Sequence, residues 1–471
     1  MTAIVWLRRD LRVHDHPAMA AALAAGDPVV PVFCLDRRLL HGQHASGPRT
    51  QFLLECLEDL ATSLRRRGGG LVMRAGAPKV VLPALAAEVG ARCVHLTGDI
   101  GPYAVRRDGL VARALARQGV RVVVHPGHFA VDDPAAVRTA SGGPYTVFTP
   151  FHRAWLRAGR REVLQAPRSL PALPSGFPAG GMPSLHDLGL RQEVDDPARG
   201  GEDAGRRATA RFLAGPVRAY GSERDGLGGG GVSHLSPYLH FGCVSPRELE
   251  DRLDRGPGPD AFRRQLCWRD FYAQVLAHFP SNARSEFQAR YRASIRWSGA
   301  QRRFEAWCAG RTGYPLVDAG MRQLRREGWM PGRARLVVGS FLTKDLGIDW
   351  RWGERWFMRL LIDGDEANNN GNWQWIASVG VDPQPPYRRI YNPARQQARF
   401  DPDGAYVRRY VPELRDVPAA YLAEPWTMPP DVQRDARCII GRHYPEPIVD
   451  HAVARREALE RYAEARLRTS A

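Results

Sequence analysis

Short apolar segments alternate with longer amphipathic ones along the first 130 residues. The apolar, β-branched segments cover residues 3–7, 28–35, 70–73, 92–96 and 120–125. Between them, residues 51–67 and 79–89 carry apolar side chains at helical spacing. Strands that alternate with helices build a parallel sheet covered on both faces. We therefore expect an α/β, Rossmann-like N-terminal domain over residues 1–130.

The hydrophobic pattern changes in the middle of the chain. From about residue 165 to residue 200 the sequence fills with Pro and Gly, which is typical of turns and linkers, and we assign residues 131–200 to an interdomain connector. Beyond it, apolar positions recur at helical spacing, with few strand-like segments, over residues 261–278, 311–327, 334–346 and 355–362. This predicts an all-helical domain over residues 201–471.

The composition is that of a globular protein, with 44% hydrophobic and 25% charged residues. No apolar run approaches the roughly 20 residues that span a bilayer, and residues 1–12 lack a signal-peptide pattern, so we expect a cytoplasmic protein without membrane contact. The seven cysteines form no Cys-x-x-Cys pair. We expect neither a disulfide framework nor a metal site.

The formal net charge of +17 and the pI near 10.1 favour an anionic partner, with nucleic acid the leading class. Lysine occurs only at Lys79 and Lys344, so nearly all of the positive charge comes from arginine. An arginine bias also makes a chain basic without forming a basic patch. Charge alone does not identify the partner.

Three clusters carry candidate chemistry. Residues 361–375 crowd acids, amides and two indoles after a helix, and such a cluster needs a ligand or a tight network. Residues 232–246 place hydroxyls before a helix start, where backbone N–H groups hold a phosphate, although ordinary N-capping gives the same pattern. Gln265, Trp268 and Arg269 are one turn apart and share a helix face, as on any polar face.

Together with other segments, these clusters resemble the photolyase/cryptochrome family nearly end to end. The resemblance is carried, in order, by residues 5–15 (VWLRRDLRVHD), 235–239 (LSPYL), 268–272 (WRDFY), 312–319 (TGYPLVDA) and 368–375 (NNNGNWQW). It is strongest to the class I photolyases of cyclobutane pyrimidine dimers. It implies an α/β antenna domain and a helical domain that binds a U-shaped FAD.

The resemblance also implies which residues contact the FAD. They are Tyr220, Ser233, Leu235, Ser236, Gln265, Arg269, Arg335, Asp363, Gly364, Asp365 and Asn369. In the family, the arginine at position 335 pairs with the acid at position 363, and the amide at position 369 faces flavin N5. Val232 stands where the family often has Thr, so one hydroxyl contact is absent.

Five residues match catalytic positions of the family and five match DNA-binding positions. Trp373, Trp350 and Trp297 fall on its electron-transfer chain, and Asn369 and Gln265 complete the catalytic set, although a single Trp in such a segment is usually core packing. Trp268 and Trp375 match the aromatic residues that flank a flipped-out pyrimidine dimer. The remaining DNA contacts that the resemblance implies are Arg224, Arg389 and Gln396.

The implied function is light-driven repair of UV-induced pyrimidine dimers in DNA by electron transfer from reduced FAD, which makes the chain a carbon–carbon lyase. The implied partner is UV-damaged DNA, the implied state is a monomer, and a folate or deazaflavin antenna would bind near residues 99–108.

Three pocket positions depart from the pattern: Gln265 replaces a usual Glu, Gly332 an Asn and Leu336 a Met. They keep open a cryptochrome-like photoreceptor without repair activity. Repair of (6-4) lesions ranks low, because residues 329–336 lack the histidines of (6-4) enzymes. A light-independent, FAD-containing DNA-binding protein ranks lowest.

Overall fold

The apolar segments of the first 130 residues form one parallel sheet. The structure is a computed structural model that describes residues 2–26, 28–174, 176–228, 230–382 and 384–468. Within these residues the sheet has five strands in the order β3-β2-β1-β4-β5. The strands are β1 (Thr2–Leu7), β2 (Val29–Leu35), β3 (Val72–Ala75), β4 (Ala91–Thr97) and β5 (Arg121–His125). The predicted α/β, Rossmann-like fold is confirmed.

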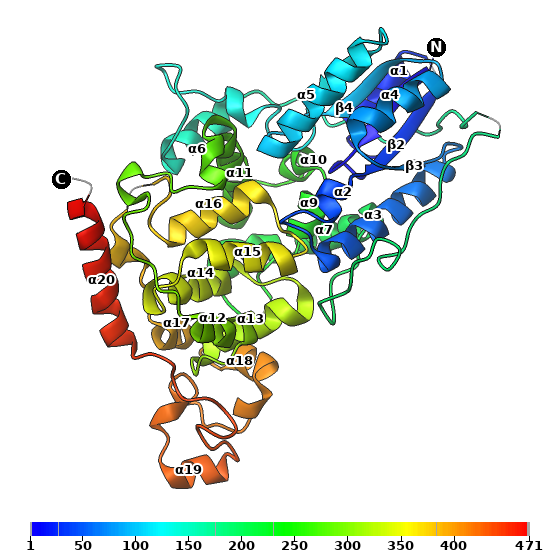
Figure 1. The fold of residues 1–471 in the computed structure, drawn as a ribbon. Coiled ribbons are helices and arrows are strands. Elements are labelled where there is room, and N and C mark those ends of the chain that lie inside the picture. The colour runs from blue at the N-terminus through cyan, green and yellow to red at the C-terminus, as the bar shows by residue number, and fades with distance from the viewer. Residues whose placement is uncertain (1, 27, 175, 229, 383, 469–471) are drawn as a thin grey trace.

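Helices cover both faces of the sheet (Figure 1). The helices of this half are α1 (Pro17–Ala24), α2 (Arg37–Leu40), α3 (Gly47–Arg65), α4 (Pro78–Glu88) and α5 (Pro102–Ala116). Side chains alternate between the faces of a strand. In β1, accordingly, Val5 and Leu7 pack in one apolar cluster with α1 and α3, and Ile4 and Trp6 pack in another with α4 and α5. Burial on both faces explains why the strands are apolar throughout.

The second half of the chain is helical, as predicted. Its helices are α7 (Glu202–Ala214), α8 (Pro216–Glu223), α9 (Ser236–His240), α10 (Pro246–Asp251), α11 (Pro257–His278), α12 (Gln301–Ala309), α13 (Pro315–Glu327), α14 (Gly332–Ser340), α15 (Trp350–Leu360), α16 (Glu366–Ile376), α17 (Pro393–Phe400), α18 (Ala405–Tyr410), α19 (Pro430–Asp435) and α20 (His451–Arg468). Single turns lie between them at η2 (Pro280–Ala283), η3 (Ala289–Tyr291), η4 (Phe341–Asp345), η5 (Pro386–Arg389), η6 (Pro412–Leu414) and η7 (Pro425–Thr427). None of the helices in the described part of the chain is long and apolar enough to cross a membrane.

The segment assigned to the connector is not only a linker. It contains the turn η1 (Pro134–Ala136) and the helix α6 (Phe148–Arg157). Phe148, Phe151 and Trp155 on α6 are buried in an apolar cluster with α11. The Pro- and Gly-rich part follows α6, so the helical domain gains a packed element from before the linker. The domain boundaries at residues 130 and 200 stay a prediction.

The two halves share one core, which fixes their relative position. Tyr238 and Phe241 of the helical half pack with α3 and β1 in a single cluster, and the thiols of Cys56 and Cys243 lie 3.3 Å apart across the boundary. Gly242 adopts a φ of +67°, and a Cβ there would lie 2.0 Å from the carbonyl oxygen of Arg9. Only glycine allows this close approach.

The C-terminal helix α20 closes the helical half on the side away from the sheet (Figure 1). Tyr462 donates a hydrogen bond to the carbonyl oxygen of Ala377. The buried Lys344 amine donates to the same oxygen at 3.0 Å and to Ser378 Oγ at 3.2 Å, with the Tyr462 ring 3.9 Å away. Burial lowers the pKa of Lys344 well below its ordinary value.

Candidate functional site

A cavity of about 630 Å³ lies within the helical half, between α8, α9, α11, α14 and α16; we call it the helical cavity. The structure brings together most of the residues that the sequence singled out. Those that line it are Tyr220, Arg224, Ser233, Ser236, Gln265, Trp268, Arg269, Arg335, Asp363, Gly364, Asp365, Asn369, Trp373 and Trp375. The substituted positions Val232, Gly332 and Leu336 line it as well.

Helix α11 presents one polar face to this cavity. Gln265, Trp268 and Arg269 lie at positions i, i+3 and i+4, which stack on one side of a helix. The other sides of the helix are buried through Cys267, Phe271 and Val275. The 22-residue length of α11 and its packing on three sides hold the polar face in place.

The segment between α15 and α16 supplies two acids. Arg335 donates to Asp363 Oδ2 at 2.7 Å, which is the pair that the family resemblance implied. The other carboxylate oxygen, Oδ1, is buried and accepts no hydrogen bond from any described residue. A buried carboxylate oxygen without a partner is costly. Asp363 therefore presents an acceptor that fits an N–H group of a ligand.

Asn369 is held by a residue that the sequence reasoning missed. Its Nδ2 donates to the backbone oxygen and to Oε1 of Glu354 on α15, both at 3.1 Å. Because both bonds use the amide nitrogen, the amide oxygen is the atom available to a ligand in the cavity. Burial raises the pKa of Glu354 to about 7, although the hydrogen bond from Asn369 acts in the opposite direction. No local sequence signal marks Glu354, because it lies in an amphipathic helix.

Asp365 connects the helical half to the sheet half. It caps α16 by accepting a hydrogen bond from the Asn368 N–H at 2.9 Å, and Arg9 donates to its Oδ2 at 2.7 Å. Arg9 also donates to Asp99 at 3.0 Å. Burial acts to raise the pKa of Asp365, but the neighbouring His240 and the Arg9 guanidinium hold it well below its usual range.

The three predicted electron-transfer tryptophans lie in different surroundings. Trp373 lines the cavity, Trp350 is buried in the core, and Trp297 is only half-buried. A β-bridge between Ser298 and Ile348 brings the segments of Trp297 and Trp350 side by side. The indole of Trp350 donates to Glu286 Oε1 at 3.4 Å.

A fourth tryptophan, which the sequence reasoning did not single out, contacts the first of these. Trp307 on α12 stands edge-on to Trp373, with ring centroids 6.3 Å apart. It is fully buried and donates to the carbonyl oxygen of Val338 at 3.1 Å. On α15, a Cβ at Gly353 would lie 2.1 Å from the Trp373 ring, so the indole fits only because residue 353 is glycine.

Besides Trp350 and Trp297, three of the predicted FAD- and DNA-contact residues do not line the helical cavity. Leu235 precedes α9 and its side chain is in the apolar core, so only its backbone faces the region. Arg389 is 1% exposed: it donates to the carbonyl oxygen of Trp375 at 2.8 Å and lies 4.0 Å from the Trp375 ring. This buried position supports a role in orienting Trp375 and gives no support to a direct DNA contact. Gln396 contacts the cavity lining only indirectly: its Oε1 accepts a hydrogen bond from Arg333 Nη1 at 3.5 Å.

Arg333 is a rim cation that the sequence reasoning left out. It lines the helical cavity, pairs with Asp225 at 2.8 Å and lies 4.2 Å from the Phe400 ring. Predicted Arg224 lines the same rim. Two arginines at the mouth of a cavity favour an anionic ligand.

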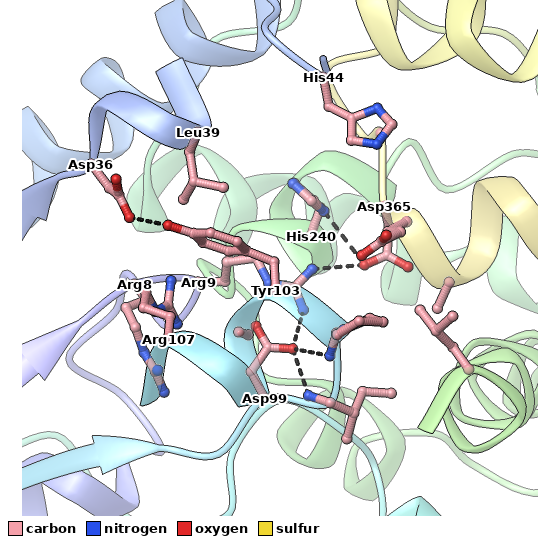
Figure 2. Close-up of a pocket in the computed structure, with 18 of the residues that line it drawn as sticks. Arg8, Arg9, Asp36, Leu39, His44, Asp99, Tyr103, Arg107, His240 and Asp365 are labelled. Carbon is pink, nitrogen blue, oxygen red and sulfur yellow. Dashed lines mark hydrogen bonds and ion pairs between the residues drawn. The ribbon is translucent and has the colours of Figure 1, made fainter. Parts of the chain in front are cut away.

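A second cavity, of about 760 Å³, lies between the sheet and the helical half; we call it the interdomain cavity (Figure 2). Arg8 and Arg9 follow β1, Asp36 follows β2 and Asp99 follows β4, so all four lie at the carboxyl ends of the strands. The sheet order reverses between β1 and β4. In open parallel sheets this reversal point is where ligands bind. The predicted antenna segment at residues 99–108 lines the cavity.

Charged and aromatic groups alternate in the interdomain cavity. The Arg8 and Arg107 guanidinium groups lie 4.6 and 4.9 Å from the Trp6 ring. Tyr103 donates to Asp36, and burial together with that bond raises the pKa of Tyr103 to about 12. Among the described residues, Arg8 Nε, Arg107 Nη2 and His44 Nδ1 are buried without hydrogen-bond partners. These lining atoms fit a polar ligand with acceptor groups.

The two cavities share a wall. His240, Arg269, Gly364, Asp365 and Asn368 line both of them. In Figure 2, Arg9 extends from the sheet half toward Asp365 and Asp99, at the centre of this wall. A ligand in either cavity therefore lies next to the same ion pairs. In the part of the chain that the structure describes, no group of three or more His, Cys, Asp or Glu side chains could hold a metal ion.

Comparison with known proteins agrees with both halves of the structure. Residues 3–174 match the family model described as DNA photolyase, and residues 262–464 match the FAD binding domain of DNA photolyase. The "Deoxyribodipyrimidine photo-lyase" of Streptomyces griseus is 42% identical over 96% of this chain and 97% of its own length.

Two solved structures are similar over nearly the whole chain. A bacterial class III photolyase from Agrobacterium tumefaciens has a TM-score of 0.92 at 35% identity, covering 99% of this chain and 98% of its own. An archaeal photolyase from Sulfolobus tokodaii, described with two FAD molecules and a novel light-harvesting cofactor, has a TM-score of 0.84 at 30% identity, covering 98% of this chain and 100% of its own.

Proposed function

The chain belongs to the DNA photolyase family, and we propose on that basis that it is a deoxyribodipyrimidine photo-lyase, which repairs UV-induced pyrimidine dimers in DNA with light and reduced FAD. One observation carries the proposal: the helical cavity gathers aromatic walls, a neutral amide and an orphaned carboxylate oxygen beside a buried tryptophan. A protein that only bound DNA would not need this arrangement.

The residues of the helical cavity fit FAD. Bound there, FAD supplies light-driven one-electron chemistry. Asp363, held by Arg335 at 2.7 Å, has Oδ1 left to accept a ring N–H. Asn369 offers a neutral amide oxygen, which accepts a hydrogen bond without adding negative charge. Tyr220, Ser233 and Ser236, which also line the cavity, fit the phosphates and the ribitol.

The substrate side of the cavity is aromatic. Trp268 and Trp375 flank its mouth in our proposal, where they stack on a dimer that has already lost base pairing and stacking in the duplex. Gln265 donates or accepts at a base edge. Arg224 and Arg333 at the rim attract phosphates, and these contacts make binding depend on salt.

Trp373, Trp350 and Trp297 conduct electrons from the surface to the helical cavity in this proposal. Trp373 lines the helical cavity and Trp297 is the partly exposed indole of the three, which supports an order that ends at Trp297. Trp307, in edge contact with Trp373, is a further indole beside the first donor. Replacing Trp373 with Phe would slow light-driven reduction of the flavin and leave dimer binding unchanged.

We assign a second chromophore to the interdomain cavity. The support is its place at the reversal point of the sheet and its buried, unpartnered Arg8, Arg107 and His44 nitrogen atoms within the described chain. The Sulfolobus relative is described with a second FAD as a light-harvesting cofactor. The absorption spectrum of freshly purified protein distinguishes a folate, a deazaflavin and a second flavin in this cavity.

The decisive test is repair of an oligonucleotide with one cyclobutane thymine dimer. Chemically reduced protein is illuminated with blue light, with a dark control and a strand carrying a (6-4) lesion. Light-dependent loss of the cyclobutane dimer alone is the expected result, and it would show that Gln265, Gly332 and Leu336 are compatible with repair. A photoreducible flavin with no repair of either lesion would overturn the proposal.

The rival function is a cryptochrome-like photoreceptor without repair activity. The observation that favours it is that all three substituted residues line the helical cavity. The finer parts of our proposal are a place among the class I enzymes, a monomeric state and a cytoplasmic location. The sequence motifs support class I, whereas the similar Agrobacterium structure is that of a class III photolyase.

A further inference from the structure

Trp268, which lines the helical cavity, stacks against an aromatic ring from α6, a helix that precedes the Pro- and Gly-rich linker. Phe148, the first residue of α6, lies parallel to Trp268, with ring centroids 3.6 Å apart and 3° between the planes. Phe148 is 4% exposed. An indole face covered by a benzene ring cannot also receive a nucleobase, so a base in the cavity meets the remaining surface of Trp268.

The backing ring is part of a longer stack along α6. His152 is stacked on Phe148 at 5.7 Å and 17°, and Trp155 on His152 at 6.4 Å and 17°. Positions 148, 152 and 155 recur at helical spacing and so share one face of α6. Trp155 is anchored at the far end, because its Nε1 donates to Asp270 Oδ2 at 2.9 Å and Arg160 lies 4.3 Å from its ring.

Both ends of the stack contact α11: Phe148 packs on Trp268, and Trp155 donates to Asp270. Phe271 on the same helix stands edge-on to Phe148 at 5.6 Å and to Trp268 at 5.5 Å. Arg264, one turn earlier, lies 4.8 Å from the Phe148 ring. The plane of Trp268 is thus set by α6 as well as by its own helix.

We propose that Phe148 is a positioning residue for damaged-DNA recognition: it fixes the plane of Trp268, so that the wall for a flipped-out dimer exists before DNA binds. The inference rests on the proposed function. A side chain that is already immobile loses no rotamer freedom when the ligand arrives. Undamaged duplex places no base in the cavity, so the contribution belongs to damaged DNA alone.

The test compares three variants of the FAD-loaded full-length protein. Phe148→Leu removes the stacked ring but keeps an apolar side chain, and Phe148→Tyr keeps the ring. Phe151→Leu is the matched control, since Phe151 is also buried on α6 but has its ring contacts with Tyr145 and Phe271. Affinity is measured for one oligonucleotide with and without a single thymine dimer, alongside the rate of flavin photoreduction.

We expect Phe148→Leu to weaken binding of the dimer strand roughly 2- to 10-fold, the range of an aromatic pair. Binding of the undamaged strand and photoreduction should not change, Phe148→Tyr should restore the affinity, and Phe151→Leu should match the wild type. Equal losses on both strands, or equal losses in the two leucine variants, would show that Phe148 serves only general packing.

A double-mutant cycle separates positioning from packing. Trp268→Ala removes the wall itself, so adding Phe148→Leu to it should cost no further affinity for the dimer strand. Additive losses would overturn the inference. If Phe148→Leu fails to retain FAD, Phe148→Met replaces it in the same cycle.

The failure of this inference is distinct from failure of the proposed function. A wild-type protein that neither prefers nor repairs the dimer strand contradicts the proposed function. A wild-type protein that repairs dimers while Phe148→Leu binds them equally well contradicts only the positioning role.

Discussion

The interdomain and helical cavities lie against the same wall, yet they are built from different chemistry. Around the interdomain cavity, arginines and aspartates form ion pairs, such as Arg9 with Asp99 and Asp365. The helical cavity has indoles and amides beside its charged groups, which include the ion pairs of Arg335 with Asp363 and of Arg333 with Asp225.

This difference separates two tasks in the proposed enzyme. Ion pairs between the halves fix the geometry of the interdomain cavity, and energy transfer from a proposed antenna depends on such a fixed distance and orientation. Aromatic walls stack on a base and conduct electrons. Four substitutions test how far the two cavities are independent, and they follow in decreasing order of expected effect.

Arg9→Gln should have the largest effect, because it acts on both cavities. It leaves Asp365 and Asp99 without their shared cation, and losing one partner of a largely buried ion pair costs about 2–4 kcal/mol. The free energy of unfolding and the retention of both chromophores should fall together. Chemical denaturation and absorption spectra measure this.

Arg106→Gln is the control for Arg9→Gln. Arg106 lines the interdomain cavity and is exposed, so removing the same charge there should change the stability by less than about 0.5 kcal/mol. If Arg9→Gln destabilised the protein no more than Arg106→Gln, the shared wall would not depend on the Arg9 ion pairs.

Glu354→Gln should change the stability of the helical half, and only at a pH above about 4.5, where the unfolded wild type loses its Glu354 proton. In the native state the pKa of Glu354 is about 7, against an ordinary value of 4.5. The wild type therefore loses stability as the pH rises from about 4.5 to about 7, because only the unfolded chain releases the proton freely. The amide of the variant has no proton to lose in this range, and its oxygen still accepts from Asn369.

The advantage of Glu354→Gln over the wild type should grow by about 3 kcal/mol across this pH range and then level off, since one pKa unit is worth about 1.4 kcal/mol. Urea midpoints of both proteins at pH 5, 6, 7 and 8 measure it. An advantage that does not vary with pH would mean that Glu354 is ionised throughout.

Gly353→Ala should displace the ring of Trp373, the first tryptophan of the proposed electron-transfer chain. The new methyl group would lie 2.1 Å from the Trp373 ring and 2.6 Å from Leu342, and such overpacking costs about 1–3 kcal/mol. The melting temperature and the rate of flavin photoreduction should both fall. Gly109→Ala on α5 is the matched control, because a Cβ there meets only Arg113 Nη1, at 3.7 Å.

In contrast, Gly109→Ala should leave photoreduction unchanged and raise the stability slightly, because alanine favours a helix. Unchanged photoreduction in Gly353→Ala would show that the position of Trp373 does not limit electron transfer.

Tyr103→Phe should have the smallest effect, confined to the interdomain cavity. It removes the hydrogen bond to Asp36, worth about 1 kcal/mol. The second chromophore should bind more weakly, while FAD content and dimer binding stay at the wild-type level. A loss of FAD from this variant would mean that the cavities are coupled more tightly than the shared wall alone explains.

The contrast between the cavities also explains what the sequence could predict. The helical cavity is lined by short segments in which several lining residues follow one another, such as residues 265–269 and 363–376, so local motifs reveal it. The fold class followed from the periodicity in the same way. Position 232 and the three substituted residues depart from the family pattern, and all of them line the cavity.

Residues that act through distant partners could not be found in this way. Arg9 and Asp365 are 356 positions apart, and Glu354 holds Asn369 from another helix. A motif position does not tell which way a side chain points: Arg389 matches a DNA-contacting position of the family and lies buried against the Trp375 ring. Helix α6 was missed because the Pro- and Gly-rich stretch after it dominated the prediction for residues 131–200.

The burial of Lys344 under the Tyr462 ring has a practical consequence. The chain has one other lysine, Lys79, which lies exposed on α4 beside the sheet. Apart from the amino terminus, an amine-reactive dye should therefore modify a single position of the folded protein, the Lys79 side chain. Unfolding would uncover the second lysine amine, so the number of dyes on lysine side chains reports directly on whether the helical half is intact.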